Sequence, residues 1–395
     1  MRSYRRYVII LLLSYPLASS GCAKARDSRI IYAEPPCSTG VIEHTVPFKE
    51  YNDLPLVKCS LNGNKAVPFL VDTGASTNII DYEYAQAIGV FPTSQEYRSL
   101  QGHAILDASI DALKIGTFQL ENVRARMIDL GSVLSDDCPA KGILGYPVFR
   151  RMELCIDYPN RTVSFKEGAF RRLERSFDPV FTFVIVPVLV ENQGPFNFIL
   201  DTGSNTSLVE PHVLAELNPP KEGVPVVRIE VEGPGEGFAW PRKGKSRRSD
   251  GISDAREFVR RACGLRIDGV LGWRHMKDCR VVVNYPTCTY RFEKTGYPPE
   301  LKPVVVNVTP DLSKDVPLSV KEIMFEFSVP MRRVSSFLST FHCEDRWQDD
   351  KRFKLINPEG LEVDKEYEII LGQGFHSKKG VPLDWSAYRF KVVSN

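Results

Sequence analysis

Hydrophobic residues along this chain occur mostly in short β-branched and aromatic runs that are broken by Gly, Pro, Asn and Asp. Such runs between turn residues are typical of β-hairpins. A stricter alternation of apolar and polar residues, typical of half-buried strands, occurs at 323–327, 367–371 and 388–392. Helical periodicity is best developed at Tyr82–Ile88 and Asp254–Ala262. The pattern therefore predicts a mainly β protein built from hairpins.

The N-terminus has a different pattern, in which basic residues precede a short apolar run. Arg2, Arg5 and Arg6 come before the run Tyr7–Leu13, and small residues lead up to Cys22. A membrane span needs about 20 apolar residues, whereas this arrangement is typical of a secretory signal peptide. We predict a signal peptide with a lipobox-like end over residues 1–22, followed by lipidation of Cys22 or by simple cleavage. The protein is then exported to the bacterial periplasm or cell envelope, with a membrane anchor in the lipidated case.

One segment of the chain occurs twice. Pro68–Ser76 reads PFLVDTGAS, and Asn197–Asn205 reads NFILDTGSN. Both copies lead an apolar run into an Asp-Thr-Gly triplet, and average residue usage predicts only about 0.1 such triplets by chance in a chain of this length. An internal repeat therefore organises the first three hundred residues.

A second landmark follows each triplet, GILG at Gly142–Gly145 and GVLG at Gly269–Gly272. The distance from the aspartate to the last glycine is 145 − 72 = 73 residues in the first copy and 272 − 201 = 71 in the second. Each landmark leads into an apolar stretch, a turn and further β-rich sequence. We therefore predict two lobes of equal length at 51–168 and 179–296, preceded by a linker at 23–50.

An apolar strand that enters Asp-Thr-Gly, followed later by two aliphatic residues and a glycine, resembles the retropepsin-like aspartic peptidases. Two such lobes in one chain are similar to the fused pseudodimer of pepsin. The resemblance implies two acid-protease β-barrel lobes that meet at the active site about a pseudo-two-fold axis. It implies that Asp72 and Asp201, one from each lobe, are catalytic. It further implies that their neighbours support the active-site loops: Thr73, Gly74, Thr202, Gly203 and Ser204.

Two adjoining carboxylates can supply both the base that activates water and the acid that protonates a peptide carbonyl. They do not both ionise easily, so one proton is shared and their pKa values split, as is general in aspartic proteases. Ser204 stands where the first copy has Ala75, and a hydroxyl that donates to a carboxylate favours its charged form. We therefore expect Asp201 to ionise more readily and Asp72 to hold the proton. No metal and no organic cofactor is needed for this chemistry.

The resemblance also implies a hairpin flap that closes over an extended polypeptide substrate. Two segments that lie between a triplet and its landmark are candidates for this flap, Tyr97–Ile105 and Arg228–Trp240. An ordinary surface hairpin is the alternative interpretation of both.

Composition restricts the other partners and sites. The chain has 51 basic and 49 acidic residues, so its formal net charge of +2 predicts no nucleic-acid partner, and the basic run Arg242–Arg248 is interpreted as a solvated loop. Removing Cys22 from the nine cysteines leaves eight, which is compatible with a disulfide framework in an exported protein. Tight CxxC or CxxH pairs that would hold a structural zinc ion are absent from the sequence.

The repeat ends before the last hundred residues, and a different segment follows at 300–395. Its alternating runs resemble a bacterial Ig-like β-sandwich, which would act as a spacer or a contact surface. Related bacterial proteins carry a PDZ domain after the peptidase, and this chain does not resemble them there.

These patterns lead to one main hypothesis, an exported aspartic endopeptidase that hydrolyses peptide bonds. The alternative is a non-catalytic cell-envelope protein that binds peptides on the same retropepsin-like fold. Two equal copies joined by a short stretch favour a monomer in which the lobes pair with each other, over pairing with lobes of another chain.

Overall fold

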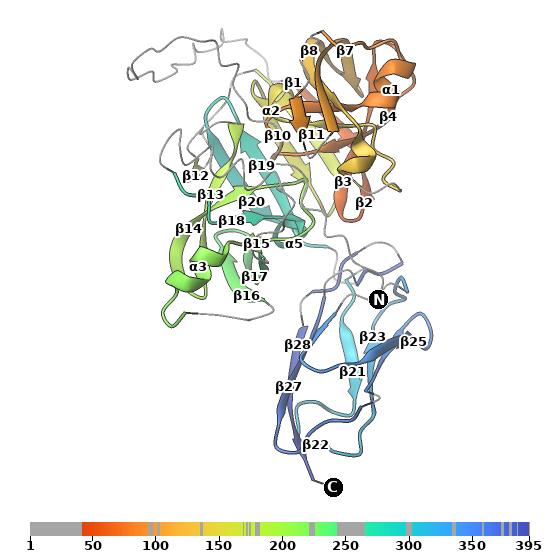
Figure 1. The fold of residues 1–395 in the computed structure, drawn as a ribbon, viewed down its shortest axis with the longest axis vertical. Coiled ribbons are helices and arrows are strands. Elements are labelled where there is room, and N and C mark those ends of the chain that lie inside the picture. Colours follow the sequence, from red (N-terminus) through yellow and green to blue (C-terminus); the bar gives the residue numbers. More distant parts are fainter. Residues whose placement is uncertain are drawn as a thin grey trace. The chain divides into compact units, whose positions relative to one another are not determined.

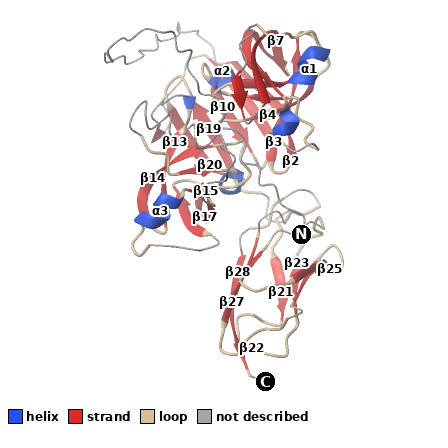
Figure 2. Cartoon of the chain, in the orientation of Figure 1, coloured by secondary structure: helices blue, strands red, loops and turns tan. Residues whose placement is uncertain are grey.

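The computed structural model describes residues 42–394 apart from one longer stretch and several short ones. The stretches left out are 94–97, 101–102, 135–136, 169, 171–172, 174, 178–181, 221–225, 243–264, 298–301, 334–336, 358, 373–374, 379–380 and 385. The predicted signal peptide with Cys22, the predicted helix Asp254–Ala262 and most of the basic run lie outside the described residues. The chain divides into two compact units, with the boundary between Lys294 and Thr295. Strands predominate over helices in both (Figure 2).

The first lobe is a closed ring of strands. The order is β3-β4-β9-β5-β8-β7, and β7 pairs back onto β3, while β2 and β6 extend the sheet at its edges. The strands are β2 (Lys49–Tyr51), β3 (Leu54–Leu61), β4 (Val67–Val71), β5 (Asn78–Asp81), β6 (Arg98–Leu100), β7 (His103–Ile115), β8 (Phe118–Ile128) and β9 (Gly142–Leu144). The apolar side chains on the inner face of the ring form the core of this lobe, with Phe69 and Met127 among them.

The second lobe repeats this ring with corresponding strands, drawn mostly in green in Figure 1. Its closed order is β13-β14-β18-β15-β17-β16. The strands are β13 (Ile185–Val190), β14 (Gln193–Leu200), β15 (Leu208–Val209), β16 (Val227–Val231), β17 (Gly235–Pro241) and β18 (Gly269–Leu271). Two closed six-stranded rings in one chain confirm the predicted mainly β fold with two acid-protease lobes.

A six-stranded sheet joins the two lobes. Its order is β1-β11-β10-β19-β20-β12, and the central pair β10–β19 contains one strand from each lobe. The strands are β1 (Ile42–Pro47), β10 (Glu153–Asp157), β11 (Thr162–Glu167), β12 (Arg175–Ser176), β19 (Cys279–Asn284) and β20 (Thr289–Lys294). At its centre Cys155 pairs with Val282, and each lies ten positions after the last glycine of its own landmark. The sheet therefore has the pseudo-two-fold symmetry of the repeat.

The predicted linker at 23–50 is wrong for residues 42–50, because β1 and the start of β2 lie there. Among the described strands, β1 is an edge strand that pairs only with β11. Its side chains are exposed or half-buried, and Ile42 is 57% exposed. An edge strand without a buried apolar face leaves no alternating pattern in the sequence.

Helices are short and lie at the ends of strands. They are α1 (Tyr82–Ala87), α2 (Tyr146–Phe149), α3 (Pro211–Glu216) and α5 (Trp273–Met276), with a 3-10 turn, η1, at Leu130–Ser132. The helix predicted at Tyr82–Ile88 is confirmed as α1, which begins where the Asp81 side chain accepts a hydrogen bond from the Tyr84 N–H at 3.0 Å. Across the part of the chain that the structure describes, no helix is long and apolar enough to cross a membrane.

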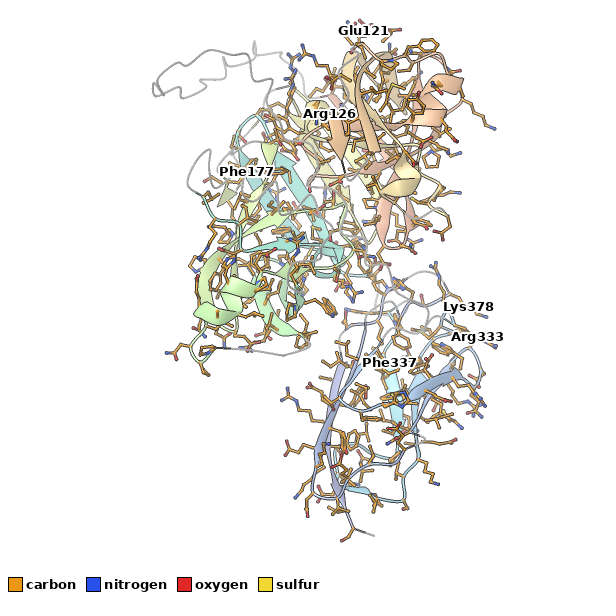
Figure 3. All side chains as sticks on the ribbon, in the orientation of Figure 1. Glu121, Arg126, Phe177, Arg333, Phe337 and Lys378 are labelled. Atoms are coloured by element: carbon orange, nitrogen blue, oxygen red, sulfur yellow. The ribbon has the colours of Figure 1, made fainter. Side chains whose placement is uncertain are left out.

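The second unit, from Thr295 onward, consists of two four-stranded sheets, β21-β23-β26-β25 and β22-β28-β27-β24. The strands are β21 (Val305–Thr309), β22 (Val316–Pro317), β23 (Glu322–Phe327), β24 (Leu338–Ser339), β25 (Glu344–Trp347), β26 (Arg352–Ile356), β27 (Glu366–Leu371) and β28 (Ser386–Val393). One core contains side chains from both sheets, for example Phe325 and Ile369. The three strands predicted from alternation are thus confirmed, and the Ig-like assignment stays a prediction. Arg333 and Lys378, labelled in Figure 3, both form ion pairs with Asp350 in this unit.

The cysteines that the structure describes do not form the disulfide framework considered from the sequence. Free thiols are found at Cys59, Cys138, Cys155, Cys279 and Cys343, and the Cys288 thiol donates to the Tyr285 carbonyl at 3.5 Å. Burial raises the pKa of the Cys279 thiol to about 12, which disfavours the reactive thiolate. Cys37 and Cys263 lie outside the described residues.

Candidate active site

The two Asp-Thr-Gly triplets lie where β4 and β14 end, and each landmark holds the backbone of its aspartate. The Asp72 N–H donates to the Leu144 carbonyl at 3.0 Å, and the Asp201 N–H donates to the Leu271 carbonyl at 3.0 Å. Because β4 pairs in parallel with β9, and β14 with β18, the aspartate loop and the landmark of one lobe meet at the same sheet edge. Both landmarks therefore position the carboxylates, although they are about seventy residues away in sequence.

Thr73 and Thr202 connect the two loops across the lobe interface. The Thr202 hydroxyl accepts from the Thr73 N–H at 3.0 Å and donates to the Val71 carbonyl at 2.8 Å. The Thr73 hydroxyl accepts from the Thr202 N–H at 3.1 Å and donates to the Leu200 carbonyl at 2.7 Å. All four bonds are buried, so the two loops are fixed relative to each other. These bonds show how Thr73 and Thr202 support the active-site loops, the role that the family resemblance implies.

Gly74 and Gly203 bring each carboxylate against the opposite loop. The Gly74 N–H donates to Asp72 Oδ1 at 2.8 Å, and the Gly203 N–H donates to Asp201 Oδ1 at 2.8 Å. A Cβ on Gly74 would lie 2.6 Å from Asp201 Cγ, and one on Gly203 would lie 2.4 Å from Asp72 Cγ. Glycine is thus required at both positions by the close approach of the two carboxylates.

The two carboxyl groups are fully buried, and burial raises the pKa of both. Neither Oδ2 atom receives a hydrogen bond from an N–H or hydroxyl of the described residues. Two carboxylate oxygens can bond to each other only if one carries a proton. Burial raises the pKa of Asp201 to about 7, and burial together with the Asp201 charge raises the pKa of Asp72 well above its ordinary value. The pair of carboxyls therefore shares one proton.

The mechanism expected for Ser204 is wrong, and the expected order of ionisation stays a prediction. The Ser204 hydroxyl donates to the Thr206 carbonyl at 2.8 Å, within its own loop, and its single proton is not available to Asp201. Ser204 supports the turn that follows Asp201.

The landmark glycines have their own side-chain partners, which the sequence analysis missed. The Gly145 N–H donates to Asn78 Oδ1 at 2.9 Å, and the Gly272 N–H donates to Ser207 Oγ at 3.0 Å. Asn78 and Ser207 each stand six residues after an aspartate. Comparing polar residues at equal distance from the two triplets would have found them.

Of the two flap candidates, Arg228–Trp240 is wrong. It forms the hairpin β16–β17, whose turn contains Gly233, and a Cβ on Gly233 would lie 2.7 Å from the Phe292 side chain on β20. The turn of the hairpin β7–β8 lies in the same way against β1, because a Cβ on Gly116 would lie 2.5 Å from Val46. Both hairpins rest on the central sheet. The other candidate, Tyr97–Ile105, contains the paired strand β6 and the start of β7, and its flap role stays a prediction.

Metal binding has no support in the described part of the chain, where no group of three or more His, Cys, Asp or Glu residues is placed to hold an ion. The dyad itself lies among backbone N–H donors and threonine hydroxyls.

Comparisons with known proteins agree with this geometry. Residues 57–148 match the family model described as aspartyl protease, and this stretch includes Asp72 and the first landmark. The match confirms the resemblance to aspartyl proteases that the repeated triplets indicate. No curated protein matches the chain.

Several solved structures are similar to parts of the chain. A retropepsin-like aspartic protease from Rickettsia conorii is 20% identical, with 33% of this chain and 95% of that chain covered and a TM-score of 0.26. The aspartic proteinase from Irpex lacteus is 9% identical, with 65% and 98% covered and a TM-score of 0.39. Basic 7S globulin from soybean is 10% identical, with 65% and 96% covered and a TM-score of 0.35.

Proposed function

We propose that this protein is an aspartic endopeptidase, in which water activated between Asp72 and Asp201 hydrolyses a peptide bond. The observation that carries the proposal is the pair of buried carboxylates, each held by the glycine N–H of its own loop and packed against the glycine of the other. Buried carboxylates in contact are costly unless they share a proton, and a shared proton is what acid–base hydrolysis requires.

The pair shares one proton, and we assign this proton to Asp72 and the role of base to Asp201. Ionised Asp201 takes a proton from the water, whose oxygen attacks the peptide carbonyl carbon, while Asp72 gives its proton to the carbonyl oxygen. In the second step Asp201 passes its proton to the amide nitrogen as the C–N bond breaks. Asp72 then takes a proton back from a hydroxyl of the tetrahedral intermediate. The products are a carboxylic acid and an amine, and the dyad returns to its starting protonation state.

The surrounding contacts support this chemistry by keeping the two carboxylates aligned. The reciprocal threonine bonds and the landmark carbonyls fix the loops before substrate arrives, so little reorganisation is needed during reaction. Both lobes belong to one chain and are joined by β10–β19. We further propose that an extended polypeptide is the substrate, that the protein acts as a monomer, and that it is exported and lipid-anchored through Cys22.

The test is cleavage of an unfolded, carboxymethylated protein by the full chain, by Asp72→Asn and by Asp201→Asn, across pH 2–8. Asparagine keeps the side-chain shape and removes the acid–base group. Each variant is expected to lose about a thousandfold or more in kcat/KM, and pepstatin is expected to inhibit the wild type.

The same assay can overturn the proposal. If the wild type cleaves nothing at any pH, or if either asparagine variant still cleaves, the dyad does not act as assigned. A silent wild type that nevertheless binds the unfolded substrate would support the peptide-binding alternative.

A further inference from the structure

The two lobes hold their landmark glycines with different side chains. In the first lobe the Asn78 amide both accepts from the Gly145 N–H and donates from Nδ2 to the Arg124 carbonyl on β8, at 2.9 Å in each case. A serine hydroxyl can also accept one hydrogen bond and donate another, but it is shorter than the asparagine amide. Ser207 therefore cannot make the same two contacts in the second lobe.

His275 on α5 provides the second contact of Ser207. Its Nδ1 lies 2.7 Å from Ser207 Oγ, and both side chains are buried. Ser207 Oγ also accepts from the Gly272 N–H, and a hydroxyl oxygen can accept a second hydrogen bond or donate its own proton to His275 Nδ1. This bond can form with a neutral imidazole in either tautomer, with Nδ1 as the acceptor or as the donor. Burial, with the charges of Arg274 and Lys277, lowers the pKa of His275 to about 3 and so favours this neutral form.

The space around His275 is matched to the imidazole. A Cβ on Gly237 of β17 would lie 2.3 Å from His275 Nε2, so only glycine fits there. The registers Ile79–Arg126 and Leu208–Trp240 make Val123 the counterpart of Gly237 in the first lobe.

The counterpart of His275 itself is Val148, because each stands three residues after the last landmark glycine. The first lobe thus has valine at both positions, and the second has histidine with glycine. The side-chain volume that is missing at Gly237 on β17 is filled by the larger His275 side chain on α5.

These contacts lead directly to the Asp201 backbone. Gly272 follows Leu271, whose carbonyl accepts from the Asp201 N–H. Trp240, on the same strand as Gly237, donates its N–H to the Ser207 carbonyl at 3.0 Å, and so ties Ser207 to β17. A displacement of Ser207 would therefore move the segment that holds Asp201.

We propose that His275 is a positioning residue of the second lobe, which holds the Asp201 loop through Ser207 and Gly272. The effect on catalysis rests on the proposed peptidase function, whereas the effect on the loop does not. His275 and Ser207 together have the role in the second lobe that Asn78 alone has in the first lobe. Because His275 acts through another residue, it is expected to change kcat and not KM.

The first lobe supplies the variants for the test. His275→Val is expected to lower kcat about tenfold, the usual consequence of losing one buried hydrogen bond. Ser207→Asn/His275→Val recreates the pair of the first lobe and should restore most of kcat. Ser207→Ala/His275→Val lacks an acceptor for Gly272 and should not. His376→Val, a buried histidine of the other unit, is the control and should leave kcat unchanged.

Amide hydrogen exchange on the full chain provides a readout that does not need activity. Exchange at Gly272 should accelerate by about tenfold in His275→Val and return towards wild type in Ser207→Asn/His275→Val. If the wild type cleaves nothing, the proposed function fails while this measurement still decides the positioning role. Should His275→Val fold poorly, Gly237→Ala, whose methyl would displace the imidazole, is the second variant and should give the same acceleration.

Two results would overturn the inference. One is unchanged exchange at Gly272 in both His275→Val and Gly237→Ala. The other is an equal kcat for the asparagine and alanine double variants, which would show that the side chain at 207 does not matter.

Discussion

The two lobes hold their aspartates with the same backbone contacts, and they differ in the side chains behind those contacts. Asp72 and Asp201 each donate to a landmark carbonyl and accept from the glycine two residues later, at matching distances. Behind them, Asn78 alone serves the first lobe, whereas Ser207 and His275 serve the second. The comparison shows that the reacting groups are kept symmetric, while their supports are free to differ as long as each N–H has an acceptor.

The largest effects are expected at the triplet glycines, where both lobes make the same contacts. Gly74→Ala would push against Asp201, and Gly203→Ala against Asp72, so each is expected to lose about a hundredfold or more in kcat. Steady-state kinetics on a peptide substrate measures this. An effect in only one of the two variants would show that the carboxylates are not packed equivalently.

The threonines test whether the lobe interface is as symmetric in energy as in geometry. Thr73→Val and Thr202→Val each remove a buried hydroxyl that accepts one bond and donates another. Each variant is expected to lower the free energy of unfolding by about 3 kcal/mol, as measured by denaturant unfolding. Values that differ by more than about 1 kcal/mol would contradict an equivalent role.

The pH dependence of stability tests His275, the support that only the second lobe has. The pKa of His275 falls to about 3 on folding from an ordinary value of 6.5, so the unfolded chain binds a proton that the folded chain does not, and stability falls as pH drops from 6.5 towards 3. Between pH 6.5 and 5 the wild type should lose about 2 kcal/mol more than His275→Val. Parallel stability curves for the two proteins would show that burial does not keep this imidazole neutral.

The smallest effect is expected at Ser204. Its hydroxyl bonds to the Thr206 carbonyl, so Ser204→Ala should leave the acidic limb of the pH–rate profile where it is and cost about 1 kcal/mol of stability at most. The same profile measured for Ala75→Ser is the matched variant of the first lobe. A limb that moves up in pH in Ser204→Ala would restore the hydroxyl as the cause of the split pKa values.

Much of the fold and the dyad could be predicted because the repeat marks residues with strict backbone demands. Asp-Thr-Gly and the landmark glycines stand where a Cβ would collide with a carboxylate or a carbonyl, for example Gly145 against the Thr77 carbonyl at 2.4 Å. Such positions stay recognisable in both copies. α1 was predictable for a related local reason, since Asp81 caps its first turn.

What the sequence did not predict depends on contacts between distant residues. β1 is held by pairing with β11 and has no buried apolar face of its own. The β16–β17 hairpin could not be told from a flap in the sequence, because its glycines look the same whether they face solvent or Phe292. His275 was missed because its partner Ser207 is 68 residues away, and a lone histidine between Arg274 and Lys277 carries no signal of that partner.

The pairing of Cys155 with Val282 has a consequence for how these two lobes can change over time. In an assembly of two identical chains, the residue on the symmetry axis would face a copy of itself, and every substitution would appear on both sides at once. Here each side is encoded separately, so a cysteine can face a valine, and one lobe can exchange an asparagine for a serine with a histidine. Because one gene encodes both lobes, a substitution can occur in one lobe while the other lobe keeps its original residues.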